Sequence, residues 1–170
     1  MSTNENIEKM TTFILQNPKG MIKEGDLRNF FDSDEAFQEI VPEIAKRFQA
    51  IGLSLVRTNY MNEKYFVLST LGKDESISPS MYGALSLLAA LYNELGTEMD
   101  IISVKQLMKD IWGEIEQLIA VNYLQSVIEK GKEWLKITPI GKSALKNILK
   151  ELNLKKILEI YETSKSETLQ

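Results

Sequence analysis

Trp134-Leu-Lys-Ile-Thr-Pro-Ile-Gly141 decides the fold, together with a weaker echo of it at Tyr65-Phe-Val-Leu-Ser-Thr-Leu-Gly72. In each stretch an aromatic residue opens a short β-prone run that leads into a turn or a helix start. The two stretches align position by position and both end on glycine. A further echo upstream aligns Ile22 to Leu27 with Ile102 to Leu107. These matches predict that one small structural unit is used twice.

The composition fits a globular protein, since 44% of the 170 residues are hydrophobic. No apolar run approaches the length of a membrane span, and the polar, acidic start from Met1 to Asn6 is unlike a signal peptide. We therefore expect a soluble, intracellular protein. The sequence contains no cysteine and no histidine, which removes thiol chemistry, the commonest general base and the commonest transition-metal ligand. We expect no enzyme, no catalytic residue and no metal site.

The residues up to position 74 predict three helices followed by a β-hairpin. Apolar residues recur at helical spacing in the helical stretches, and the period changes after Gly52 to that of strands. Asp34 is the expected cap of the third helix, and Pro42 inside it is expected to kink or split it. The predicted helices cover about 7–16, 24–31 and 34–51, with an extended segment at 21–22 and a hairpin of 53–58 with 64–68.

The same order recurs after a polar connector. Ser78-Pro79 starts a leucine-rich helix that Gly96 ends, and Ser103 is the expected cap of the helix after it. The remaining predicted elements are an extended segment at 101–102, a short helix after Trp112-Gly113, strands at 123–128 and 134–137, and a final helix from Thr138-Pro139 to about Tyr161.

Helix, short strand, two helices and hairpin is the order of a winged-helix domain. The predicted fold class is therefore mostly α with small β-hairpin wings (α+β), built as two tandem winged-helix domains. We place domain A at residues 1–74, domain B with its C-terminal helix at 75–162, and a disordered tail at 163–170.

The third helix of a winged-helix domain is where a DNA reader places its base-contacting side chains. From Asp34 to Ala50 there are four acids and two bases, and from Glu114 to Asn122 two acids and no base. Phosphate would repel both helices, so base reading through them is not expected.

Positive charge gathers in another region, where eight lysines lie between Lys130 and Lys156 against only Glu133 and Glu151. This patch is either a solvated helix face or a surface for sequence-independent phosphate contact or for an acidic partner. The candidate contact residues are Lys130, Lys132, Lys136, Lys142, Lys146 and Lys150. In the first wing, Tyr60, Met61 and Tyr65 form either a partner groove or a set of half-buried wing residues.

Gly141-Lys142-Ser143 matches the end of a phosphate-binding loop. Such a loop needs a glycine five positions earlier, and Lys136 stands there. We therefore expect no nucleotide and no other cofactor.

The order of elements and several local runs resemble the MAGE homology domain. Ile51-Gly-Leu-Ser-Leu-Val-Arg57 with Lys64-Tyr-Phe-Val-Leu-Ser-Thr-Leu71 resembles the first wing of that domain, and Ile22 to Leu27 resembles its second helix. The helix from Met81 to Leu95 and the run Val121 to Leu124 resemble its long apolar helix and its later strand. MAGE proteins and non-SMC element subunits belong to the tandem winged-helix (KITE) proteins that bind the kleisin of SMC complexes.

The resemblance implies a non-catalytic accessory subunit of an SMC-type chromosome-organising complex. Such a subunit dimerises with itself or a relative, grips a kleisin helix in apolar grooves, and adds non-specific DNA contact. It would be cytoplasmic and chromosome-associated, or nuclear in a eukaryote. A winged-helix transcription regulator or transcription-machinery subunit is the alternative function, and an ESCRT-type scaffold is a third.

Overall fold

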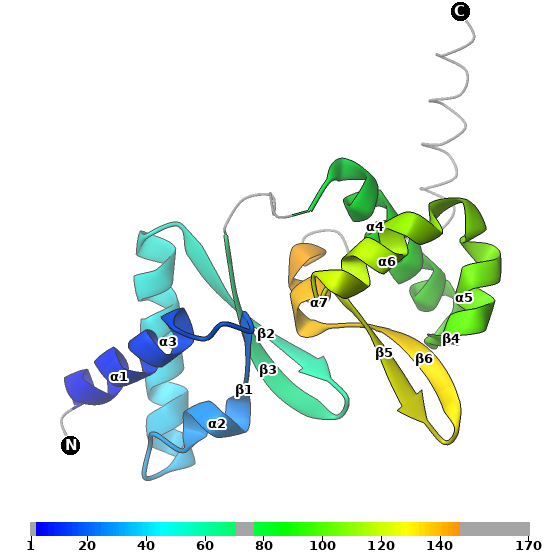
Figure 1. Ribbon diagram of the computed structural model, residues 1–170. Helices are drawn as coiled ribbons and strands as arrows, with labels where there is room; N and C mark the ends of the chain where they lie inside the picture. The colour runs from blue at the N-terminus through cyan, green and yellow to red at the C-terminus, as the bar shows by residue number, and fades with distance from the viewer. Residues whose placement is uncertain (1–2, 71–76, 147–170) are drawn as a thin grey trace, which may run out of the picture. The chain divides into compact units, whose positions relative to one another are not determined.

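The computed structural model describes residues 3–70 and 77–146. The chain divides into two compact units, Met1–Asp74 and Glu75–Gln170, each of which carries its own three-stranded antiparallel sheet (Figure 1). Helices supply most of the remaining secondary structure. The predicted α+β class is confirmed, and each unit has the element order of a winged helix.

Unit 1 contains three helices and one small sheet. The sheet has the strand order β1-β3-β2, with Phe66 of the central strand opposite Ile22 on one side and Arg57 on the other. The elements are α1 (Thr3–Leu15), β1 (Met21–Lys23), α2 (Glu24–Arg28), α3 (Asp34–Ala50), β2 (Leu53–Tyr60) and β3 (Glu63–Thr70).

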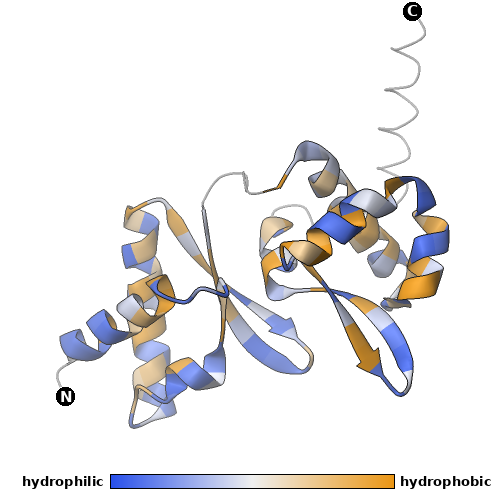
Figure 2. Cartoon of the chain, in the orientation of Figure 1, coloured by the Kyte–Doolittle hydropathy of each residue, from blue (hydrophilic) through white to orange (hydrophobic). Residues whose placement is uncertain are grey.

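The core of unit 1 lies between α1, α2, α3 and one face of the sheet. Phe37, Ile44 and Phe48 project from α3 into it at helical spacing and are buried. Figure 2 shows hydrophobic and hydrophilic residues interleaved along α3, as expected for a helix with one face toward a core. α3 runs through Pro42 without a break, and Pro42 lies on its exposed side, so the predicted split is wrong.

Unit 2 repeats the arrangement with a shorter third helix and a shorter wing. Its sheet has the order β4-β6-β5, and α4 packs against α6 above it. The elements are α4 (Pro79–Leu95), β4 (Met99–Asp100), α5 (Ile101–Leu107), a 3-10 helix η1 (Lys109–Ile111), α6 (Trp112–Ala120), β5 (Leu124–Glu129), β6 (Lys132–Ile137) and α7 (Pro139–Ala144).

The central strands of the two sheets correspond as the sequence echo predicts. Phe66 of β3 and Leu135 of β6 each lie between two strands, opposite Ile22 and Met99 respectively. Met99 therefore takes the place of Ile22, which leaves Ile102 outside the sheet. The predicted match of Ile22–Leu27 with Ile102–Leu107 is three residues out of register.

Burial gives the physical reason for that correction. Leu27 and Val104 are fully buried, whereas Leu107, the residue that the echo paired with Leu27, is 64% exposed. The start of α5 differs for the same reason. Asp100 caps the helix by accepting a hydrogen bond from the Ser103 amide at 3.0 Å, so the predicted cap at Ser103 is wrong.

Each wing closes in a two-residue turn whose residues both have positive φ. In the first wing these are Met61 and Asn62, at 49° and 64°, and in the second Lys130 and Gly131, at 52° and 78°. Paired positive φ values match the twist of an antiparallel hairpin. The strands of the first wing therefore run to Tyr60 and from Glu63, further than predicted.

Two more helix starts follow from capping chemistry. Ser33, rather than the predicted Asp34, caps α3 by accepting from the Ala36 amide at 3.2 Å. Thr138 caps α7 and Pro139 occupies the first turn, as predicted. α7 ends at Ala144, short of the predicted end, and the rest of the predicted final helix and the predicted tail lie outside the described residues.

Candidate partner and nucleic-acid surfaces

The third helices of both units expose acidic side chains. On α3, Asp34, Glu35, Glu39 and Glu43 are all exposed, and the Glu43 carboxylate lies 3.9 Å from Arg47. On α6, Glu116 is exposed and accepts a hydrogen bond from the Trp112 indole at 2.6 Å. A surface of this sign repels the phosphate backbone of nucleic acid.

Two of the candidate contact lysines lie at the wing tip of unit 2. Lys130 occupies the turn, and Lys132 begins β6; both are exposed. Glu129 is the ladder partner of Lys132 across the hairpin, and Glu133 follows directly in β6. The two lysines of the wing tip therefore have acidic residues beside them.

Lys136 does not belong to an exposed basic patch. Its ammonium lies 2.7 Å from a Glu129 carboxylate oxygen and 3.3 Å from one of Glu98, and the residue is 8% exposed. The hydrogen bond to Glu129 raises its pKa, so it stays charged. Because two carboxylates already neutralise it, this lysine contributes to the fold of unit 2.

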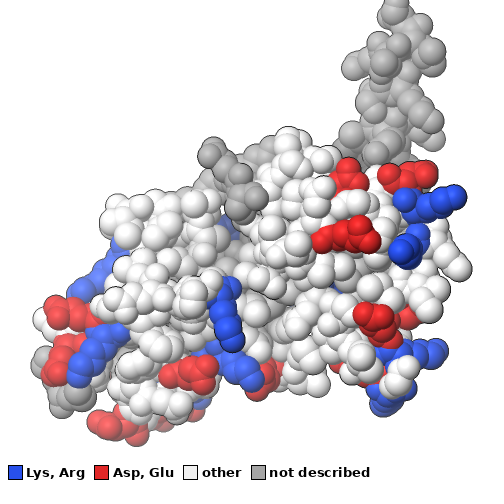
Figure 3. Space-filling view, in the orientation of Figure 1, with Lys and Arg blue, Asp and Glu red and all other residues white. Residues whose placement is uncertain are grey.

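Lys142 and Lys146 do not share one helix face, because α7 ends at Ala144. Lys142, in α7, is half-buried, and burial lowers the pKa of its amine. Lys146 is half-buried in the turn after α7, and Lys150 lies outside the described residues. On the face shown in Figure 3, the described lysine and arginine side chains form small groups with acids beside them. Of the candidate lysines that the structure describes, only Lys130 and Lys132 are exposed, and the patch as a whole stays a prediction.

The three candidate groove residues of the first wing differ in exposure. Tyr60 is buried, Tyr65 is half-buried and Met61, in the turn, is 46% exposed. The rings of Tyr60 and Tyr65 pack edge to face with centroids 6.0 Å apart. The Tyr65 hydroxyl donates to Glu63 at 3.3 Å, and Lys23 pairs with the same carboxylate at 2.7 Å. Of the three, Met61 alone offers an exposed apolar contact.

Several exposed apolar side chains, which the sequence interpretation missed, are further candidates for contact with a partner. Ile102 and Leu107 on α5 are 69% and 64% exposed, and Ile128 on β5 is 77% exposed. The sequence interpretation placed Ile102 in an extended segment and matched Leu107 with buried Leu27, so neither was expected to be exposed. The alternation of side chains along β5 does not predict that Ile128 is exposed, because Ile128 lies on the same face of the strand as buried Leu124.

In residues 3–70 and 77–146, no group of three acidic residues converges in a way that could hold a metal ion. Within the same ranges, every helix is too short or too polar to span a bilayer.

Comparison with known proteins agrees at the level of fold. A chain of a solved structure titled "Nse1-Nse3-Nse4 complex" superposes with a TM-score of 0.53 at 10% sequence identity. The match covers 84% of this chain and 71% of that one. No family model and no curated protein matches the sequence. The structural similarity supports a fold of two winged-helix units in tandem.

Proposed function

We propose that this protein is a non-catalytic accessory subunit of an SMC-type chromosome-organising complex, and that it binds a helical segment of the kleisin. The observation that carries the proposal is the acidic third helix of both units. A winged-helix protein that read DNA bases would place positive or amide side chains on these helices. Two units that keep the fold and lack that surface are suited to binding protein.

The fold comparison supports the same assignment. The matched chain comes from a complex of three Nse proteins, and the order of elements here resembles that of MAGE and non-SMC element subunits. In this proposal the protein acts at the chromosome and assembles as a homodimer or heterodimer.

The exposed apolar residues of unit 2 suit the proposed partner. An amphipathic helix binds through apolar anchors at helical spacing. Ile102, Leu107 and Ile128 are exposed side chains of that chemistry on α5 and β5. Burying one such side chain contributes about 1.5–3 kcal/mol, so each anchor would matter to affinity.

The test compares variants of one helix. Ile102→Asp and Leu107→Asp are expected to weaken kleisin binding at least tenfold by isothermal titration, which corresponds to about 1.4 kcal/mol. Gln106→Asp introduces the same charge at an exposed position of α5 and serves as the matched control. Unchanged kleisin affinity in both apolar variants, with native circular dichroism, would reject α5 as the contact surface. Absence of any kleisin binding by the wild-type protein would reject the function.

A further inference from the structure

The strand β2 forms one edge of the sheet of unit 1. Among the strands that the structure describes, only β3 pairs with it, and their register is regular from Leu53 to Tyr60. With eight residues β2 is the longest of the four edge strands, since β1, β4 and β5 have three, two and six. Very short edge strands protect a sheet from pairing with another chain. Its length gives β2 no such protection.

The composition of β2 does not protect this edge either. Natural edges carry lysine, proline or a bulge. β2 contains neither lysine nor proline, and its pairing with β3 has no bulge. Its one charged side chain, Arg57, already donates to the Glu24 carboxylate of its own unit at 2.6 Å. A regular strand with so little charge favours the addition of a further strand.

The alternation of hydrogen bonds decides which backbone groups of β2 point outward. The turn after β2 has two residues, so Tyr60 and Glu63, which flank it, bond to each other. Bonds to β3 then recur at every second residue, which includes Val56. Leu55 and Arg57 therefore direct their N–H and C=O groups away from β3, where an added strand would bond to them.

The sequence of β2 is complementary to itself in one antiparallel register. When a two-fold axis passes beside Val56, this valine lies opposite Val56 of a second copy. Ser54 then lies opposite Thr58 of the second copy, and Leu55 opposite Arg57. No charge is opposite a like charge, and the Val–Val and Ser–Thr pairs are of the kinds that stabilise cross-strand contacts.

Two exposed apolar residues flank β2 and fit the same register. Ile51 precedes the strand and is 67% exposed, and Met61 follows it and is 46% exposed. Both lie five positions from Val56 in the sequence. Each therefore comes to the end of the paired strands where the other lies in the second copy. Contact between them would remove apolar surface from water at both ends.

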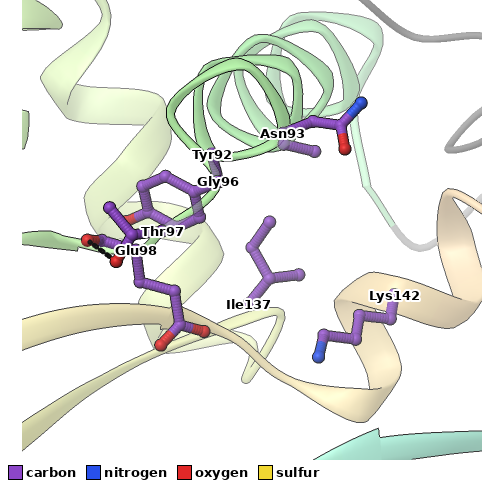
Figure 4. A pocket seen from close by; sticks show the side chains of 8 residues that line it. Tyr92, Asn93, Gly96, Thr97, Glu98, Ile137 and Lys142 are labelled. Atoms are coloured by element: carbon purple, nitrogen blue, oxygen red, sulfur yellow. Dashed lines mark hydrogen bonds between the residues drawn. The ribbon is translucent and has the colours of Figure 1, made fainter.

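We propose that two copies of the protein associate through β2, antiparallel and centred on Val56, so that their two sheets join into one. Such an interface uses the same surface on both copies and closes as a dimer. It lies in unit 1, so it shares no residue with α5 and β5 or with the recess beside α4 of unit 2 (Figure 4). The inference goes beyond the proposed function, which names no dimer surface, and it stands without a kleisin.

Single cysteines test the register, because the chain contains no cysteine of its own. In Val56→Cys the two thiols belong to residues about 4.5 Å apart at Cα, within the disulfide range of roughly 4.4–6.8 Å. Oxidation with copper phenanthroline is expected to give a disulfide-linked dimer on a non-reducing gel. Thr58→Cys, on the same face of β2, is the matched control. Its two thiols would lie four residues apart along the strands, about 13 Å, and are expected not to link.

An equal mixture of Ser54→Cys and Thr58→Cys is expected to link, although neither variant does so alone. This mixture decides the register if Val56→Cys does not fold. A disulfide in Thr58→Cys alone as strong as in Val56→Cys, or no disulfide in either Val56→Cys or the mixture, would overturn the proposal.

Sedimentation equilibrium tests the association itself. The wild-type chain is expected to have twice its monomer mass of 19.4 kDa. The double variant Ser54→Lys, Thr58→Lys is expected to be monomeric, because lysines would lie opposite each other across the interface. Ser54→Glu combined with Thr58→Lys places opposite charges in the same positions and is expected to be dimeric. A monomeric wild type, or a two-lysine variant that dimerises like the wild type, would overturn the proposal.

Discussion

Gly141 has less free space around it than an alanine would need. A Cβ atom at this position would lie 2.4 Å from the Tyr123 carbonyl oxygen and 2.9 Å from a methyl carbon of Ile137. The same carbonyl accepts a hydrogen bond from the Thr138 amide at 3.1 Å, so moving it would weaken that hydrogen bond. The glycine thus allows α7 to start directly against the turn before β5.

We predict that Gly141→Ala lowers the free energy of unfolding of unit 2 by about 2 kcal/mol. Both tryptophans, Trp112 and Trp134, belong to unit 2, so urea unfolding followed by tryptophan fluorescence reports on this unit. Gly83→Ala is the control, because a Cβ at this exposed position of α4 meets nothing within 4 Å. The control is expected to stabilise by about 0.5–1 kcal/mol. Equal effects of the two substitutions would contradict this account of Gly141.

Glu24 is the buried acid of unit 1 and joins α2 to the sheet. It is 3% exposed, and its carboxylate accepts hydrogen bonds from Arg57 at 2.5 and 2.6 Å and from Arg28 at 2.8 Å. Burial alone raises the pKa of Glu24, but the bonds from the two arginines outweigh it and hold the pKa below its ordinary value. The charged form therefore stabilises the folded state.

We predict that Glu24→Gln destabilises unit 1 by about 2 kcal/mol at neutral pH, since two partly exposed arginines lose their shared anion. The folded pKa is depressed, so this stability is present above the unfolded pKa of about 4.3 and is lost as pH falls through the folded value. Hydrogen exchange at the Phe66 amide measures it. Glu39→Gln, on the exposed side of α3, is the control. A difference between wild type and Glu24→Gln that stayed constant into acid would refute the role of the charge.

Residue roles were predictable where local chemistry decides them. Ser78 and Thr138 cap their helices because their hydroxyl oxygens accept from amides of the first turn, and the proline after each one marks the helix start in the sequence. The partners of Lys136 were not predictable, since Glu98 reaches it only through the pairing of β4 with β6. Long-range pairing of this kind leaves no mark in local spacing.

At the scale of elements, the start of α5 shows which residue caps the helix, Asp100 or the predicted Ser103. The Asp100 carboxylate accepts from both the amide and the hydroxyl of Ser103, at 3.0 and 2.7 Å. These bonds hold the pKa of Asp100 below its ordinary value, so the cap weakens when acid protonates it. Asp100→Ala is expected to lower the urea midpoint of the tryptophan signal more than Ser103→Ala does. The reverse order would restore Ser103 as the cap.

The order of elements was predictable, and their register was only partly so. Periodicity locates helices and hairpins, because burial selects apolar residues at fixed spacing. The two-residue strand β4 carries too little pattern to be placed, and the Ile-Ile pair at 101–102 is more β-prone than Met99-Asp100. The helix cap at Asp100 and the pairing with β6 overrode that propensity.

At the scale of the whole molecule, the net charge of −4 and the acidic third helices disfavour contact with DNA. Among the candidate lysines that the structure describes, only Lys130 and Lys132 at the wing tip of unit 2 are exposed. If DNA is bound, we predict that the double variant Lys130→Glu, Lys132→Glu abolishes it. Converting both to glutamine should lower the slope of log affinity against log salt by about 2. Fluorescence anisotropy with a labelled duplex measures both quantities. The control is Lys46→Glu on α3, and an equal loss in that variant would point away from the wing.

If the proposal is right, the protein belongs to an SMC-type complex in the cell. The most direct test is affinity purification of the tagged protein from its native cell after mild crosslinking, with mass spectrometry of the recovered proteins. We predict recovery of an SMC ATPase and its kleisin, with crosslinks to the kleisin on α5 or β5. Recovery of RNA polymerase, or of specific DNA fragments without an SMC protein, would contradict the claim and favour a transcription regulator.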